Sequence, residues 1–218
     1  MRGLSWSGGK DAAMALQSLG RDDVDWLLTT VSRPFDRITM HGVRRSLLEA
    51  QARSIGLPVA VVELPRDPSN GRYDAAMLAA LAELKGAAER PRLAFGDIFL
   101  EDVRGYREEL LGPTDFVAEF PLWGRDTAVL ADELVADGFE AIVVCVDTEQ
   151  LDPAFLGRSL DTAFFTDLPR GVDPCGENGE FHTFVYDGPV FSTPVSFRRG
   201  RIEERERFHF LDLVPDNP

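Results

Sequence analysis

The chain has 218 residues, 44% of them hydrophobic, which is enough to bury the core of one large domain or two small ones. Its net charge of −14 repels phosphate backbones and argues against a large nucleic-acid surface. No apolar run approaches the ~18 residues of a membrane span and the N-terminus lacks a secretory pattern, so we expect no membrane association and a cytoplasmic location.

The first feature along the chain is the run S-W-S-G-G-K-D at residues 5–11. It follows a predicted N-terminal strand and precedes a predicted helix over residues 12–19, which Gly20 can end. Small residues let a phosphate approach the backbone, while Ser7 and Lys10 add a hydroxyl and a positive charge. The N–H groups and positive dipole end of the helix point at the same place. The run therefore predicts an anion-binding loop.

This loop does not fit the commoner phosphate-binding pattern G-x-x-x-x-G-K-[ST]. Leu4 stands where that pattern needs its first glycine, and Asp11 stands where it needs the hydroxyl that binds magnesium. Residues 7–11 instead resemble the S-G-G-x-D-S loop of the N-type ATP pyrophosphatases, with Ala12 in place of the last serine. That resemblance implies ATP as a substrate, cleaved between its α and β phosphates.

Strands and helices then alternate along the chain. Continuous apolar runs, typical of strands buried on both faces, predict strands at residues 26–31, 59–64, 93–95 and 115–120. Apolar residues at helical spacing predict helices over residues 44–55, 73–87 and 103–111. This alternation predicts an α/β fold with an open parallel sheet and helices on both faces.

In such a sheet, ligands bind beyond the carboxyl ends of the strands. Three features fall there: the loop at residues 5–11, the segment around Thr30 and Val31, and Gly96-Asp97. We expect them to converge on one site. Gly96 can let the backbone approach a ligand, and Asp97 can supply oxygen to magnesium, although an acid also suits the first turn of a helix.

The second part of the chain has a different pattern. Asp126 or Thr127 can cap a helix over residues 128–136, which precedes a strand at residues 141–146. Turn signals at Asp187-Gly188 and Gly200 then separate three predicted antiparallel strands, at residues 181–186, 190–198 and 201–210. We therefore divide the chain into an α/β domain at residues 1–121 and a smaller α+β domain at residues 122–218.

A second unusual segment covers residues 171–183. Glycine and proline mark a loop just before a predicted strand, and the loop carries two acids three residues apart, Glu177 and Glu180. A loop at the mouth of a strand can present both carboxylates to a ligand. A plain acidic turn is the alternative.

Taken in order, several segments resemble the diphthine–ammonia ligase family over nearly the whole chain: the phosphate loop, Gly96-Asp97-Ile98, residues 121–126, Leu156-Gly157-Arg158 and residues 175–181. The resemblance implies an adenine-nucleotide-binding domain of the HUP type, a smaller C-terminal domain, and a site between them. It also implies that ATP activates a carboxylate acceptor, pyrophosphate leaves, and ammonia forms an amide from the acyl adenylate. Asn178 departs from the family's usual E-G-G-E, and the acceptor, protein-borne or small, stays open.

The loop pattern and the resemblance together assign the site residues. The nucleotide-binding set is Ser5, Ser7, Gly8, Gly9, Lys10, Asp11, Thr30, Val31 and Gly96. The catalytic set is Lys10, Asp11, Asp97, Glu177 and Glu180, with Asp11 and Asp97 as candidate Mg²⁺ ligands. The acceptor set is Trp123, Arg125, Gly176, Glu177, Asn178 and Glu180. A homodimer is left open.

Two other functions are weighed beside this one. A tRNA-modifying enzyme with the same loop fits less well because the chain is acidic, and a non-catalytic ATP sensor gains from Ala12 but does not need the second loop. His41 can face the nucleotide or solvent, and His182 is interpreted as structural. Cys175 is the thiol to test for reactivity.

Overall fold

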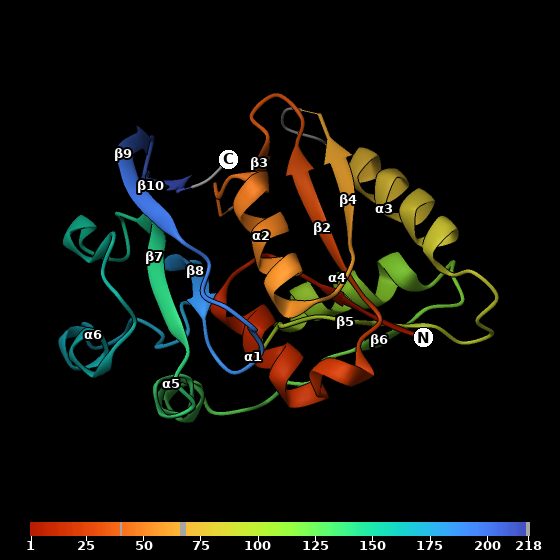
Figure 1. Ribbon diagram of the computed structural model, residues 1–218, viewed down its shortest axis with the longest axis horizontal. Helices are drawn as coiled ribbons and strands as arrows, with labels where there is room; N and C mark the ends of the chain where they lie inside the picture. Colours follow the sequence, from red (N-terminus) through yellow and green to blue (C-terminus); the bar gives the residue numbers. More distant parts are fainter. Residues whose placement is uncertain (40, 66–68, 217–218) are drawn as a thin grey trace.

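The computed structural model describes residues 1–39, 41–65 and 69–216, and its larger sheet is mainly parallel (Figure 1). Its parallel strands run in the order β4-β2-β1-β5-β6, that is Val59–Leu64, Trp26–Ser32, Arg2–Ser5, Arg92–Ala94 and Val117–Glu119. A short strand, β3 (Arg37–Ile38), pairs antiparallel with the end of β2. Consecutive strands thus lie on both sides of β1, as in a doubly wound sheet.

Helices cover both faces of this sheet. They are α1 (Lys10–Leu19), α2 (Arg45–Ile55), α3 (Asn70–Leu84) and α4 (Glu101–Leu111). Successive residues of β2 point to opposite faces, so Leu27 belongs to the core layer of α1 and α2, whereas Leu28 belongs to that of α3 and α4. The predicted α/β fold class is confirmed.

The C-terminal part forms an antiparallel sheet in the order β8-β7-β10-β9, that is Phe181–Asp187, Glu140–Asp147, Phe208–Pro215 and Phe197–Arg205. It is accompanied by α5 (Thr127–Ala136) and α6 (Thr162–Asp167). Asp126 caps α5 as predicted, because its carboxylate accepts from the N–H groups of Ala128 and Val129. Short 3₁₀ turns occupy Arg21–Asp23 and Pro153–Phe155.

The predicted turn at Gly200 is wrong. Gly200 lies inside β9, where a β-carbon would come 3.1 Å from the carbonyl oxygen of Asp212, beside an irregularity in the pairing with β10. The chain reverses instead at Glu206, whose φ of 53° lies in the left-handed region. Residues 190–196 are not a strand, and β3 and α6 were not predicted. Gly200 is thus used for a close approach of two strands.

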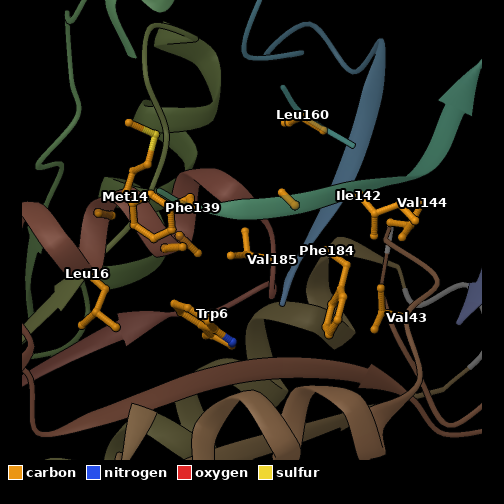
Figure 2. Packing of buried hydrophobic residues seen from close by; sticks show 14 of the residues in the cluster. Trp6, Met14, Leu16, Val43, Phe139, Ile142, Val144, Leu160, Phe184 and Val185 are labelled. Carbon is orange, nitrogen blue, oxygen red and sulfur yellow. The ribbon is translucent and has the colours of Figure 1, made fainter. Parts of the chain in front are cut away.

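The two sheets share one apolar core. Figure 2 shows Trp6, Met14 and Leu16 from the N-terminal part in the same packed layer as Phe139, Ile142 and Phe184 from the C-terminal part. The N–H of Val185 also donates to the carbonyl of Gly8 at 2.9 Å. The carboxyl ends of β1, β2 and β5 therefore face β8, and the site lies there. The boundary at residue 121 stays a prediction. Across the ranges described above, no helix is both long and apolar enough to cross a bilayer.

Candidate functional site

The loop between β1 and α1 is held by contacts with the protein's own side chains. Gly8 has φ of +80°, and a β-carbon there would lie 2.7 Å from Oε1 of Gln51. A β-carbon on Gly9 would lie 2.8 Å from Cε1 of His41. The N–H of Lys10 donates to Oγ1 of Thr183 at 3.0 Å. The left-handed φ therefore favours glycine at Gly8, and a side chain at Gly9 would have to displace the His41 ring, before any ligand is considered.

Gln51 is the anchor of this loop, and the sequence analysis did not identify it. Its side chain is fully buried, with Oε1 accepting from Trp6 Nε1 at 3.0 Å. Its Nε2 donates to the carbonyls of Gly8, at 3.0 Å, and Val185, at 2.6 Å. One amide of α2 thus joins the loop and β8. The available signal was a glutamine on the apolar stripe of a predicted helix, where a buried amide needs partners.

Lys10 and Asp11 form an ion pair at the start of α1, in which the lysine is buried and the aspartate is partly exposed. Lys10 is 3% exposed, its Nζ lies 2.9 Å from each carboxylate oxygen of Asp11, and it lies 5.4 Å from the centre of the Phe181 ring. Burial alone lowers the pKa of Lys10, but the Asp11 carboxylate raises it above its ordinary value. Lys10 is therefore a fixed positive charge. The pKa of Asp11 is raised by burial, which Lys10 only partly opposes.

A cavity of about 320 Å³ lies between the carboxyl ends of the parallel strands and the C-terminal sheet. The predicted residues that line it are Ser5, Ser7, Lys10, Asp11, Thr30, Gly96, Asp97, Gly176 and Glu177. The phosphate loop, the strand ends and the acidic loop thus meet at one cavity. Gly8, Gly9, Val31, Trp123, Arg125, Asn178 and Glu180 are not among its lining residues. The roles of all these residues stay predictions.

Asp97 lies beside Arg107 of α4 and next to Ile98, the residue whose N–H binds Glu177 of the acidic loop. Arg107 Nε is 3.5 Å from Asp97 Oδ2, and burial raises the pKa of Asp97 although Arg107 opposes this. Within the described part of the chain, neither of these two atoms has a hydrogen-bond partner. The hydroxyl of Thr29, which is also in the cavity wall, has none either. Asp97 and Arg107 face each other as an ion pair, so of the three groups the Thr29 hydroxyl is the one without a charged partner. Gly96 brings this segment against α1, since a β-carbon would lie 2.9 Å from the backbone of Asp11.

The two acids of the second loop have different positions. Glu177 lines the cavity, and its Oε1 accepts from the N–H of Ile98 at 2.7 Å. Burial raises the pKa of Glu177 to about 7. Glu180 is 3% exposed, and its Oε1 accepts from the N–H of Asp173 and from Nδ2 of Asn178, both at 3.0 Å. Glu177 therefore faces the cavity, whereas Glu180 and Asn178 hold the loop.

Trp123 and Arg125 lie away from the cavity. Arg125 Nη2 is 2.6 Å from Glu133 Oε1, in a surface ion pair on α5. The Trp123 ring stacks with the guanidinium of Arg104, 4.7 Å from the ring centre. Both contacts are structural, and the assignment of these two residues to an acceptor stays a prediction.

Two histidines line the cavity, and Cys175 is buried next to the lining residue Gly176. The ring centres of His41 and His182 are 4.6 Å apart, and both residues line the cavity. Burial lowers the pKa of His41 to about 4 and that of His182 well below its ordinary value, so both rings are neutral at pH 7. Burial raises the pKa of Cys175 to about 12, which leaves a protonated thiol and speaks against reactivity.

Comparison with known proteins adds family matches to this geometry. The family model described as the diphthamide synthase N-terminal domain matches residues 2–110, and that of the diphthamide synthase C-terminal domain matches residues 126–213. A diphthine–ammonia ligase of Danio rerio is 38% identical over 79 residues, 34% of this chain and 31% of the relative. One of Mus musculus is 30% identical over 117 residues, 51% of this chain and 44% of the relative. The chain spans less than half the length of these curated relatives.

Proposed function

The chain belongs to the diphthamide synthase family, and from this premise we propose that it is an ATP-dependent ligase that joins ammonia to a carboxylate acceptor. The observation that carries the proposal is the shared cavity, which collects the phosphate loop, Asp97 and Glu177 from three separate segments. A nucleotide sensor would not need the acidic loop at the same cavity. The acceptor is a carboxylate, either on a protein or on a small molecule.

In the first step, an oxygen of the acceptor carboxylate attacks the α phosphorus of ATP. The bond between that phosphorus and the bridging oxygen to the β phosphate breaks, and pyrophosphate leaves with the electron pair. Lys10 supplies a fixed positive charge for the phosphates, and the first turn of α1 supplies N–H groups. These groups stabilise the charge that develops on the leaving group.

In the second step, the nitrogen of ammonia attacks the acyl carbon and AMP leaves. The nitrogen must then lose a proton for a neutral amide to form. Glu177 lines the cavity, and its pKa of about 7 suits it to accept that proton at neutral pH. Glu180 acts through Glu177, because it holds the loop on which Glu177 is placed.

Magnesium fits this site as a companion of the nucleotide. In the described part of the chain, no group of three or more His, Cys, Asp or Glu side chains is arranged to hold a metal ion by itself. Mg²⁺ commonly takes one or two carboxylates together with substrate phosphates and waters. Asp97 and Asp11 both lie in the cavity wall, and Asp97 Oδ2 makes no hydrogen bond within the described part of the chain, although it faces Arg107 as an ion pair. These two residues would hold the ion, whose chemistry is to neutralise pyrophosphate charge.

The products of ATP test the proposal without knowledge of the acceptor. ATP labelled at the α and γ phosphates would be incubated with protein, Mg²⁺, ammonium and, in turn, cell metabolites, total protein or tRNA. We expect AMP and pyrophosphate, in amounts that depend on the metabolite or protein pool. ADP and phosphate as the only products would refute it. Dependence on tRNA would favour the RNA-modifying alternative, and tight ATP binding without turnover in any pool would favour the sensor.

A further inference from the structure

A second cavity of about 270 Å³ lies beside the first, between β3 and the C-terminal sheet. In Figure 1, β3 lies between β2 and the strands β9 and β10. Buried Ile38, Leu64 and Cys145 contribute to its wall, while Phe35, 41% exposed, and the half-exposed Arg205 mark its opening to solvent. Phe208 and Phe210 complete an aromatic wall. This cavity has no part in the nucleotide chemistry described above.

The two cavities are neighbours, because Ile38, Thr39 and His182 contribute to the wall of both. The first cavity, at about 320 Å³, is near the lower end of the range for ligand pockets, so a nucleotide leaves little room in it for a second substrate. A carboxylate that attacks the α phosphate must therefore come from an adjoining space. His182 is neutral at pH 7, so it does not hold a carboxylate there as an ion pair.

Two arginines, Arg37 and Arg205, line the second cavity, and both belong to a larger ion-pair cluster. Arg37, Arg44, Arg201 and Arg205 share two carboxylates, those of Glu203 and Asp212. The Arg205 guanidinium lies 5.4 Å from the ring centres of both Phe35 and Phe210, so a cation and two aromatic faces meet at the opening. The cavity wall contains these two guanidinium groups and no carboxylate among its described residues, which favours an anion there although the chain has a net charge of −14.

We propose that the second cavity is the acceptor site and that it takes a carboxylate with an apolar or aromatic stem no larger than an amino-acid side chain. The inference rests on the proposed ligase function. The stem lies against Ile38, Leu64 and the phenyl rings. Without nucleotide, Arg205 binds the carboxylate at the opening; with a nucleotide in the first cavity, the carboxylate moves past His182 to the α phosphate. Arg205 thus selects anionic acceptors.

Binding of small probes tests this on the full chain without nucleotide. We would titrate 3-phenylpropionate and compare it, by calorimetry, with 3-phenylpropanamide and 3-phenylpropylamine, which keep the stem but lose or reverse the charge. The acid should bind and the amine should not. Arg205→Gln should weaken binding of the acid by about tenfold or more, as for loss of a charged contact, and Arg205→Lys should restore most of it.

Arg201→Gln is the matched control. Arg201 is on the same strand and pairs with the same Glu203, but it is largely exposed and is not part of the cavity wall. Arg201→Gln should therefore leave binding of 3-phenylpropionate unchanged. Absence of binding by the wild-type chain, or equal binding by Arg205→Gln, would overturn the inference. If AMP is released in an acceptor-dependent way and Arg205→Gln does not affect this release, the inference is overturned but the ligase function stands. If the acid binds as expected but ATP yields ADP, the ligase function is overturned but the binding site stands.

Discussion

In the proposed mechanism, Lys10 is the residue on which the phosphate chemistry depends most directly. The chain has two lysines, and Lys10 is the one that is buried. The Asp11 carboxylate raises its pKa and so keeps it positively charged. Lys10→Ala removes a charged contact to the phosphates. We expect kcat/KM for AMP release to fall roughly 30- to 1,000-fold, which corresponds to a loss of about 2–4 kcal/mol in transition-state stabilisation. Lys85→Ala, at a surface pair with Asp115, should leave turnover unchanged. Unaltered turnover of Lys10→Ala would show that the loop is only a turn.

Glu177 should make folding stability depend on pH. Burial raises its pKa to about 7, so between its ordinary value of 4.5 and about 7 the folded protein retains a proton that the unfolded chain has lost. The free energy of unfolding therefore falls as pH rises through this interval. Glu177→Gln should reduce that fall, measured by urea unfolding at pH 5 and pH 8. Glu204 is exposed on β9, so Glu204→Gln should show the same decrease in unfolding free energy as the wild type. If Glu177→Gln shows a decrease as large as that of the wild type, the prediction is contradicted.

At the level of elements, α1 and α2 act as a bridge between the two sheets. Gln51 of α2 satisfies Trp6, Gly8 and Val185 at once, and the first turn of α1 contacts Thr183 of β8. The conformation of the phosphate loop therefore depends on the C-terminal sheet as well as on β1. This explains how a loop that needs φ > 0 at Gly8 is held in place before any nucleotide binds.

Gln51→Leu tests this bridge. The substitution roughly keeps the volume but leaves the buried Trp6 Nε1–H without its partner and removes one bond from the carbonyls of Gly8 and Val185, although Gly8 still accepts from the N–H of Val185. We expect a loss of about 2–4 kcal/mol in the free energy of unfolding. The KM for ATP should rise more than kcat falls, because the loop loses its anchor. Gln17→Leu on α1, which removes one exposed hydrogen bond to Asp137, should cost about 1 kcal/mol or less. Equal losses in the two variants would argue against the bridge.

Elements with a strong apolar period were predictable from the sequence, and contacts between distant segments were not. The strands and helices of the larger sheet follow their apolar runs, and Asp126 caps α5 as its sequence indicates. Gly200 was misinterpreted because a glycine required for close packing looks the same in sequence as one in a turn. Glu177 and Glu180 are equivalent in a sequence pattern, and only the fold shows that one faces the cavity and the other its own loop.

On the scale of the whole molecule, the sequence pattern predicts two domains, but the apolar core is continuous across both parts of the chain. The largest apolar cluster runs from Leu4 and Leu16 through Phe139 to Phe184 and Val185, across both sheets. The cavity is built from both parts in the same way, since its wall includes Lys10, Asp97 and Glu177. A site that needs both sheets works only while they stay packed together. Separate unfolding of the C-terminal sheet would therefore abolish nucleotide chemistry.

Phe184→Ala tests whether the two parts unfold together. Phe184 is fully buried on β8, whereas all three tryptophans, Trp6, Trp26 and Trp123, precede α5. Loss of a buried phenyl ring costs about 3–5 kcal/mol. If the chain is one cooperative unit, this cost should appear undiminished in urea unfolding followed by tryptophan fluorescence, although the substitution is in the other sheet. Hydrogen exchange of the β7 amides should report the same loss. A tryptophan transition that stays at its wild-type midpoint while the β7 amides lose protection would show two independent domains, and would support the predicted division at residue 121.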